Sequence, residues 1–121
     1  MINKLSKEVH SNNKAKGFYD DSKNLGEMLA LIHSEVSEAL EADRKDIYTS
    51  ENIFAVNGWT SDADFKDSFK RKVKDSFEDE LADIMIRVMD LAAFKGVNLE
   101  EHIKAKMRYN ALRPHKHGKK Y

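Results

Sequence analysis

The chain carries very few residues that interrupt a helix: one proline and five glycines among 121 residues. A protein built of many short strands needs frequent turns, and such turns favour glycine and proline. The apolar residues of this chain instead recur at spacings of three and four, which is the period of a helix with one buried face. The sequence therefore predicts an all-α protein.

Four helical segments are expected from this periodicity. They run from Ile2 to Lys16, from the N-cap Ser22 to about Arg44, from Ser76 to Lys95, and from Asn98 to the residue before Pro114. Gly17 and Gly96 provide C-terminal stops for the first and third segments. Asn98 and Glu101 have the spacing of a capping box at the start of the fourth segment.

The stretch 46–75 between the second and third segments is harder to interpret. It contains Phe65, Phe69 and Val73 at spacings of four, which predicts a short helix leading into the third segment. A long connection of this kind is usually functional or mobile. The closing residues 115–121 are basic, and we expect no helix there.

The composition limits the classes of protein to be considered. The length favours a single domain over residues 1–121, and the lack of cysteine excludes disulfides and thiolate metal sites. Lys and Arg number 21, as do Asp and Glu, so a net charge of zero gives no sign of a nucleic acid polymer as partner. No apolar run is long enough to span a membrane, and no signal peptide is expected, so we predict a cytoplasmic protein.

Two acidic pairs stand out on the second and third helical segments. Glu35 and Glu38 are three residues apart, as are Glu80 and Asp83. On a helical wheel, the first member of each pair falls roughly 80° from the centre of the apolar stripe and the second roughly 140°, on the same side. If the two stripes pack together, all four carboxylates can line one edge of the interface.

Four carboxylates at one edge would repel each other unless a cation neutralised them. Mg²⁺ suits this role because it prefers oxygen ligands in near-octahedral geometry. Glu35 sits deeper and is the better fixed ligand, whereas Glu38 is the better candidate for a general base. The simpler alternative is that each pair belongs to a solvated helix face, because such acidic pairs are common on exposed helices.

The acidic pairs belong to longer motifs that resemble a known family. The segments HSEVSEALE at 33–41 and EDELAD at 78–83 are similar to the ExxE and ExxD halves of the signature of the MazG-like, all-α nucleoside triphosphate pyrophosphohydrolases. The segment GFYD at 17–20 fits the same group. The C-terminal pattern of its small, often phage-type members is matched by Lys106, Tyr109, Asn110, Arg113 and residues 117–119. The interval between the two acidic halves is longer here than is usual in the family, which leaves substrate choice open.

The resemblance implies a fold of antiparallel helices that is completed by oligomerisation into a homodimer or homotetramer. It implies hydrolysis of a nucleoside or deoxynucleoside triphosphate to the monophosphate and pyrophosphate, with Mg²⁺, or Mn²⁺ in its place, as cofactor. The catalytic and metal-ligand roles then fall to Glu35, Glu38, Glu80 and Asp83. The phosphoribosyl-ATP and dUTP pyrophosphohydrolases of the same superfamily use similar acidic pairs and remain an alternative.

A basic stripe on the fourth segment is a candidate for binding the substrate phosphates. Lys106, Asn110 and Arg113 follow one another at i, i+4 and i+7, and both lysine and arginine bind phosphate oxygens. Lys119 could close over the phosphates from the tail. The alternative is a solvated basic helix end that complements the helix dipole.

Aromatic residues are candidates for stacking on the base of a nucleotide: Phe18, Tyr19 and Trp59, although each type is more often a core residue. Arg87 follows Asp83 by four residues, so we interpret it as the partner of an intrahelical ion pair that orients Asp83. A different class of protein also remains open. It is a non-catalytic helical dimerisation module whose acidic residues are ordinary surface groups.

Overall fold

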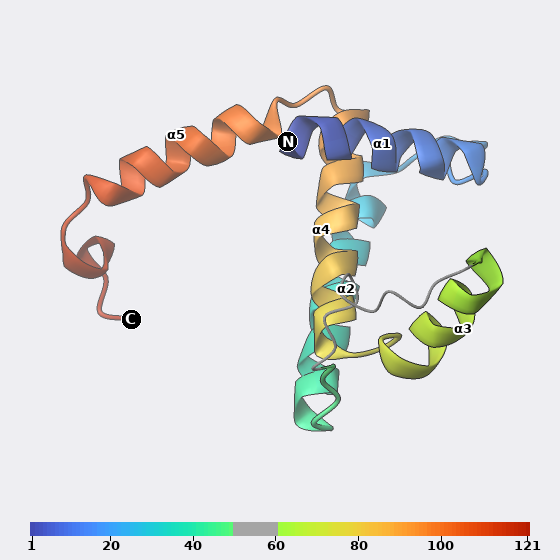
Figure 1. Cartoon of the computed structure of the whole chain (residues 1–121). Helices are drawn as coiled ribbons and strands as arrows, with labels where there is room; N and C mark the ends of the chain where they lie inside the picture. The colour runs from blue at the N-terminus through green and yellow to red at the C-terminus, as the bar shows by residue number, and fades with distance from the viewer. Residues whose placement is uncertain (50–60) are drawn as a thin grey trace. The chain divides into compact units, whose positions relative to one another are not determined.

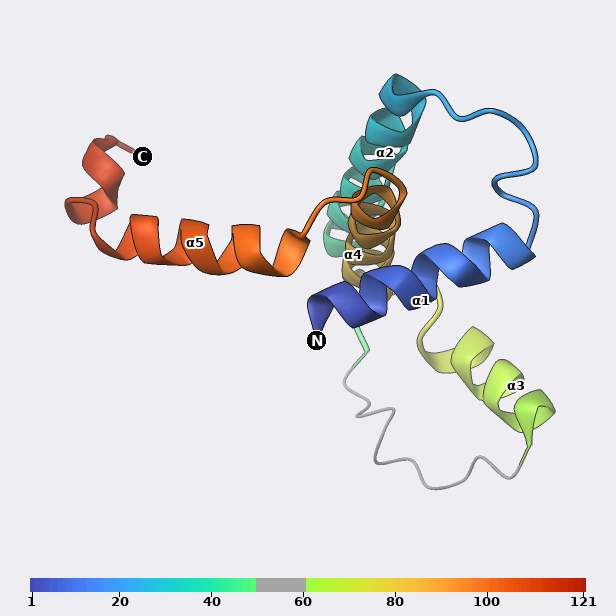
Figure 2. The same ribbon diagram turned by 90° about the horizontal axis from the view of Figure 1, so that it is seen from above.

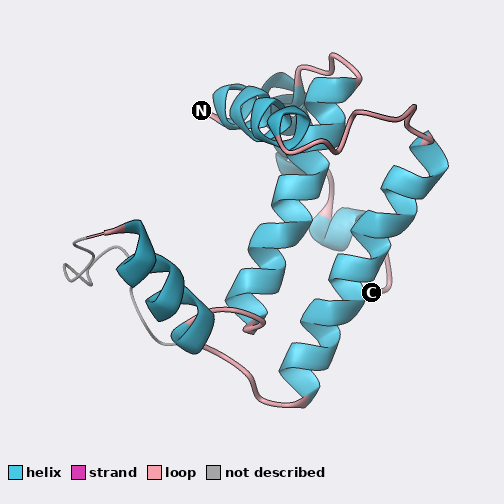
Figure 3. Ribbon diagram, turned by 90° about the vertical axis from the view of Figure 1, so that its right-hand side faces the viewer, coloured by secondary structure: helices cyan, strands magenta, loops and turns pink. Residues whose placement is uncertain are grey.

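A computed structural model describes residues 1–49 and 61–121 of the chain (Figure 1). The helices are α1 Ile2–Ala15, α2 Leu25–Arg44, α3 Asp62–Lys72, α4 Phe77–Phe94, α5 Leu99–Ala111 and the short 3₁₀ segment η1 His115–Gly118. No strand occurs among the described residues, which confirms the predicted all-α class (Figure 3). Within the same residues, no helix combines the length and the apolar content that a membrane crossing requires.

The chain divides into two compact units. Residues 1–22 and 88–121 form the first, and the continuous segment 23–87 forms the second. Helix α4 contributes to both, because Phe77–Arg87 belongs to the second unit and the remainder to the first. The acidic pairs therefore fall in the second unit, and the basic stripe of α5 falls in the first.

The start of α2 does not follow the expected cap. Asn24, not Ser22, is the N-cap residue: its Oδ1 accepts a hydrogen bond from the backbone N–H of Glu27 at 3.1 Å. Asn24 has an extended backbone, with φ −94° and ψ 119°, which directs its short side chain at the first turn. The prediction of Ser22 was wrong because this polar run contains several residues able to cap a helix, and the one nearest the apolar stripe does so.

The other helix starts follow their sequence signals. Ser61 Oγ accepts a hydrogen bond from the backbone N–H of Asp64 at 3.1 Å and so caps α3, which confirms the short helix expected in this stretch. Asn98 Oδ1 accepts one from the N–H of Glu101 at 3.2 Å at the start of α5. These bonds satisfy N–H groups that have no partner within their own helix.

The tail contains the segment η1, where no helix was expected. It is a left-handed turn, because φ is 55° at Lys116 and 53° at His117. The turn is closed by the N–H of His117, which donates to the carbonyl of Pro114 at 2.7 Å. The guanidinium of Arg113 donates in addition to the carbonyl of His117 at 3.1 Å. Periodicity misses this element because it is held by local hydrogen bonds rather than by an apolar face.

In the second unit, α2 lies along the Phe77–Arg87 part of α4, as two views at right angles show (Figures 1 and 2). The buried residues of α2 are Glu35, Ala39 and Ala42. The segment after α2 reaches the start of α4, because the carbonyl of Ile47 accepts a hydrogen bond from the N–H of Phe77 at 2.8 Å. The seam between the two helices is thus formed by small residues and by an acidic side chain.

The centres of the apolar stripes lie outside this seam. Five large apolar side chains of α2 and α4 are between 43% and 50% exposed: Leu29, Val36, Leu40, Leu81 and Met85, here called the outer apolar face. In contrast, Glu35 and Glu80 are only 8% and 6% exposed. The sequence pattern predicted stripes facing each other with the acids at the edge, whereas the structure turns both helices so that the acids lie inward. Small alanines at the seam leave room for the longer glutamate side chains.

In the first unit, the starts of α1 and α5 cap each other. The N–H of Ile2 donates to Glu100 Oε1 at 2.7 Å, and the N–H of Glu100 donates to Asn3 Oδ1 at 3.1 Å. The Asn3 amide also donates to Asn98 Oδ1 at 2.6 Å. Each helix therefore supplies the side chain that satisfies the free backbone N–H groups of the other.

Candidate metal centre

Three carboxylates converge in the second unit. Glu35 and Glu38 come from α2, where a spacing of three places them on one side of the helix. Glu80 comes from the first turn of α4. Each of the three offers an oxygen that lies within 4.8 Å of the other two, and we call this group the carboxylate triad.

Two members of the triad carry buried oxygens without a hydrogen-bond partner. Within the described part of the chain, neither Glu35 Oε2 nor Glu80 Oε2 accepts a hydrogen bond. Glu38, in contrast, is exposed. Burying a carboxylate is unfavourable unless a hydrogen bond or an opposite charge compensates it. A cation bound at these two orphaned oxygens would therefore compensate the unfavourable burial of the carboxylates.

The other oxygen of Glu35 is held by an arginine on the neighbouring helix. The Nε–H of Arg87 on α4 donates to Glu35 Oε1 at 2.8 Å. The interpretation of Arg87 as the intrahelical partner of Asp83 was wrong, because the guanidinium pairs across the seam instead. A buried carboxylate gains more from such a charged hydrogen bond than a more exposed one does. This bond fixes Glu35 with its Oε2 left available.

The three carboxylates hold their protons unequally. Burial is the largest single influence on the pKa of Glu35 and raises it, but the hydrogen bond from Arg87, the contacts with the neighbouring carboxyl groups and the charge of Arg87 together leave this pKa below its ordinary value. A hydrogen bond with Glu35 and the negative charge of Glu35 raise the pKa of Glu38. Burial, followed by the charges of Glu38 and Asp83, raises the pKa of Glu80 to about 7. The cluster is thus an acidic site that holds protons in the absence of another cation.

Asp83, the fourth acid of the two pairs, does not join the triad. It is half-buried on α4, and its pKa is raised by burial first and then by the charges of Asp79 and Glu35. The structure therefore brings three of the four expected carboxylates together and leaves the fourth near enough to affect them electrostatically. The metal-ligand role of all four residues stays a prediction.

A second acidic group, which the sequence analysis missed, shares Glu80 with the triad. Asp75, Asp79 and Glu80 offer oxygens within 4.8 Å of one another. Asp79 Oδ2 accepts a hydrogen bond from the backbone N–H of Asp75 at 2.9 Å, and Ser76 Oγ accepts one from the N–H of Asp79 at 3.2 Å. These bonds form the start of α4, so we assign Asp75 and Asp79 to capping. The spacing of Asp75 and Asp79, four residues apart, was the available signal.

The donor set of the triad fits a hard divalent cation. Carboxylate oxygens are the ligands that Mg²⁺ and Mn²⁺ prefer. On one Mg²⁺ ion, ligand oxygens are about 3 Å apart when adjacent and about 4 Å apart when opposite. The separation of at most 4.8 Å within the triad is close to this span. Glu35 and Glu80 would hold the ion through their orphaned oxygens, and Glu38 would complete the set from the exposed side.

The residues expected to bind phosphate lie in the first unit. Lys106 and Arg113 lie close to the ring of Tyr109, with Lys106 Nζ at 5.1 Å and Arg113 Cζ at 5.4 Å from the ring centre. Asn110 Oδ1 is buried and has no hydrogen-bond partner among the described residues. Lys119 follows the turn η1 and is exposed. The stripe thus presents two cations close to one aromatic ring.

The aromatic residues expected to contact a base have different surroundings. Phe18 is 61% exposed. Tyr19 is packed, because its hydroxyl donates to Asp90 Oδ2 at 2.8 Å and its ring lies 5.2 Å from that of Phe94. Burial, and then the hydrogen bond with Asp90, raises the pKa of Tyr19. Trp59 lies outside the described residues.

Comparisons with protein-family models, with curated proteins and with solved structures give no match for this chain. A functional conclusion therefore depends on the motifs of the sequence and on the geometry of the carboxylate triad.

Proposed function

We propose that this protein is a metal-dependent hydrolase that converts a nucleoside or deoxynucleoside triphosphate to its monophosphate and pyrophosphate. The observation that carries the proposal is the convergence of Glu35, Glu38 and Glu80 with two buried oxygens that lack a partner. A solvated helix face would place its carboxylates in water and apart from each other. The resemblance of the motifs at 33–41 and 78–83 to the MazG-like family supports the same reaction.

The three carboxylates have different roles in this proposal. Glu35 is fixed by Arg87 and stays ionised, which suits a permanent ligand. Glu80 is buried and is the second fixed ligand. Glu38 is exposed and its pKa is raised, so it can orient a water molecule and accept its proton. A bound divalent ion would neutralise phosphate oxygens and lower the pKa of a bound water.

We also propose that the basic stripe of α5 binds phosphate groups. We assign phosphate binding to Lys106, Asn110, Arg113 and Lys119. The support is the pair of cations close to the ring of Tyr109. Because the guanidinium of Arg113 already donates to the carbonyl of His117, its position is partly fixed before any phosphate arrives.

Pyrophosphate release from a panel of nucleotides tests the hydrolysis. The panel contains canonical and modified (d)NTPs, dUTP and phosphoribosyl-ATP, each with Mg²⁺ or Mn²⁺. We expect the wild-type protein to release pyrophosphate from at least one of them, and Glu35→Gln and Glu80→Gln to lose at least about a hundredfold in turnover. Glu41→Gln is the matched control, because Glu41 lies on α2 but is exposed and outside the triad.

The result also separates the alternatives. Turnover confined to dUTP or to phosphoribosyl-ATP would identify one of the related enzymes of the superfamily. Turnover that survives in both Glu35→Gln and Glu80→Gln would refute the role of the triad. If no nucleotide is hydrolysed by the wild-type protein, the hydrolase proposal is wrong and the non-catalytic dimerisation module becomes the better account.

We further propose that a second copy of the chain covers the outer apolar face and so completes an antiparallel helical bundle as a homodimer or homotetramer. Leu29, Val36 and Leu40 recur at the spacing of a helix packing face, and Leu81 and Met85 add to it from α4. The zero net charge of the chain does not oppose association with itself.

Sedimentation analysis of two lysine variants tests the oligomer. Val36→Lys should shift the protein towards monomer, because it places a charge in the centre of the outer apolar face. Leu31→Lys is the control, since Leu31 is 38% exposed on the opposite side of α2. A monomeric wild-type protein, or equal association of both variants, would refute the proposed interface.

A further inference from the structure

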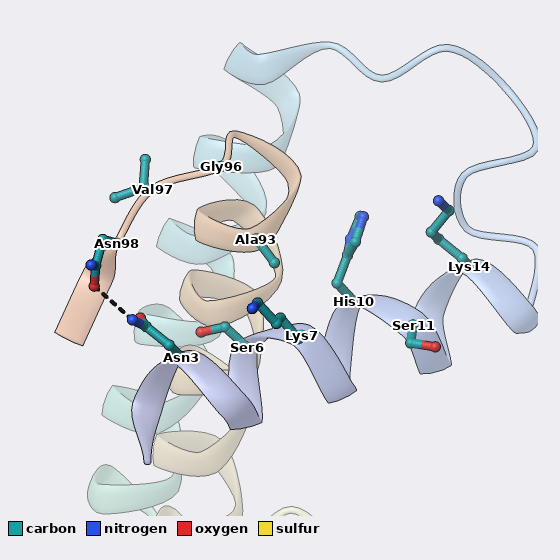
Figure 4. Close-up of a pocket in the computed structure, with 10 residues that line it drawn as sticks. All are labelled: Asn3, Ser6, Lys7, His10, Ser11, Lys14, Ala93, Gly96, Val97 and Asn98. Atoms are coloured by element: carbon teal, nitrogen blue, oxygen red, sulfur yellow. Dashed lines mark hydrogen bonds between the residues drawn. The ribbon is translucent and has the colours of Figure 1, made fainter.

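A groove lies in the first unit, between α1 and the end of α4 with the connection that follows it (Figure 4). Its volume of about 480 Å³ is within the range of small-molecule sites. One wall is a single face of α1, which Figure 4 shows with its side chains in sequence along the helix. The opposite wall is formed by Ala93, Gly96 and Val97. All lining residues belong to the first unit, whereas the carboxylate triad belongs to the second.

A buried hydroxyl without a partner lines the groove. Ser6 is 4% exposed, and its Oγ makes no hydrogen bond within the part of the chain that the structure describes. A serine hydroxyl on a helix can bond a carbonyl of the preceding turn, but Ser6 does not. Since a buried hydroxyl loses free energy when it has no partner, Ser6 is a donor that a ligand in the groove would satisfy.

Positive charge is distributed along the same face of α1. Lys7 and Lys14 both line the groove and stand two helical turns apart, which is about 10 Å along the axis. Among the described residues, neither forms an ion pair with a carboxylate. The side chain of His10 lies between them (Figure 4).

The carboxylate of Asp90 lies next to His10, but both of its oxygens already have hydrogen-bond partners. His10 Nδ1 lies 2.9 Å from Asp90 Oδ1, and the hydroxyl of Tyr19 donates to Asp90 Oδ2 at 2.8 Å. A carboxylate oxygen accepts hydrogen bonds, so the imidazole of His10 donates through Nδ1. The carboxylate of Asp90 is therefore engaged on both oxygens, and His10 is held in a fixed orientation.

The remaining residues that line the groove determine how polar a ligand it can hold. The Asn3 side-chain amide donates to Asn98 Oδ1, as the dashed line in Figure 4 shows, so these two groups are already engaged with each other. Val97 is 45% exposed and provides an apolar surface beside Ala93. The groove thus offers cations and a hydroxyl donor on one wall and apolar carbon on the other.

We propose that this groove binds a phosphorylated organic anion. Its phosphate groups would contact Lys7, Lys14 and the hydroxyl of Ser6, and its less polar part would lie against Val97. The spacing of the two lysines favours an extended diphosphate over a single phosphate group. This site goes beyond the proposed hydrolysis, because it needs neither the carboxylate triad nor a divalent ion.

Calorimetric titration of the full chain in EDTA tests the groove, with ADP and inorganic pyrophosphate as probes. We expect ADP to bind, and to bind more tightly than pyrophosphate because of the apolar wall. Lys7→Gln/Lys14→Gln should weaken ADP binding at least about fivefold, and Ser6→Ala about tenfold, since it removes a hydrogen bond to a charged group. Lys4→Gln is the matched control, because Lys4 is an exposed lysine of α1 that does not line the groove.

Three outcomes would overturn the proposal. The first is a lack of binding of either probe at millimolar concentration. The second is equal affinity for ADP and pyrophosphate, which would show that the apolar wall does not contribute to binding. The third is an unchanged affinity in both Lys7→Gln/Lys14→Gln and Ser6→Ala. Because divalent ions are absent, none of these results depends on whether the triad catalyses hydrolysis.

Discussion

Among single residues, Glu80 has the most demanding environment. It is buried, it belongs to the carboxylate triad as well as to the acidic group at the start of α4, and one of its oxygens has no partner in the described residues. Its pKa rises from an ordinary value of 4.5 to about 7. Without a divalent ion, the folded protein therefore tends to keep Glu80 protonated, and the stability of the fold depends on pH through this group.

The stability of the metal-free protein should fall as the pH rises from about 4.5 to about 7. Glu80 has a raised pKa in the folded state, so between these values the folded protein keeps a proton that the unfolded chain has lost. The stabilising contribution of Glu80 is fully present below about pH 4.5 and is lost as the pH rises through about 7. Thermal unfolding in EDTA should show this slope, and Glu80→Gln should reduce it. An equal slope in the variant would contradict the assignment.

Arg87 should act as a positioning residue for Glu35. Arg87→Ala removes the hydrogen bond to Glu35 Oε1 and leaves that carboxylate with less compensation, so we expect the free energy of unfolding to fall by about 1–3 kcal/mol in EDTA. Added Mg²⁺ should recover part of the loss, since it replaces the missing charge. Urea unfolding with and without Mg²⁺ measures both values. An equal loss in the two conditions would mean that Arg87 acts only through packing.

Within single elements, α2 carries most of the site and begins at a cap that can be tested on its own. Asn24→Ala removes the hydrogen bond to the N–H of Glu27 and should reduce the free energy of unfolding by about 1 kcal/mol. Ser22→Ala is the matched control and should change it by less than about 0.5 kcal/mol. Chemical denaturation of both variants decides between the two caps, and a larger effect of Ser22→Ala would restore the original expectation.

The helices could be predicted from the sequence, but the rotation of α2 and α4 about their axes could not. Apolar periodicity identifies an amphipathic helix, and it placed both acidic pairs on helices. It also suggested that the widest apolar stripe faces the partner helix, whereas Val36 and Leu81 lie on the outside and Glu35 lies at the seam. The ion pair between Arg87 and Glu35 depends on the same rotation. The sequence could only suggest Asp83, which lies four residues before Arg87, as its partner.

In the whole molecule, metal binding should be linked to stability. A ligand that binds only the folded state stabilises it by about 2.7 kcal/mol at a hundred times its dissociation constant. We therefore expect millimolar Mg²⁺ or Mn²⁺ to raise the melting temperature by several degrees in the wild-type protein and in Glu41→Gln, but not in Glu38→Gln. A wild-type protein that melts at the same temperature with and without these ions would argue against the metal centre.

The mutual capping of α1 and α5 has a consequence for the order of folding during synthesis. The bond between Ile2 and Glu100 joins residues 98 positions apart, whereas the second unit is one continuous segment, 23–87. A ribosome must therefore deliver α5 before the first unit can close, while the second unit can form earlier. Protease digestion of nascent chains arrested before and after α5 should show protection of 23–87 first. The carboxylate triad would then form ahead of the groove beside α1.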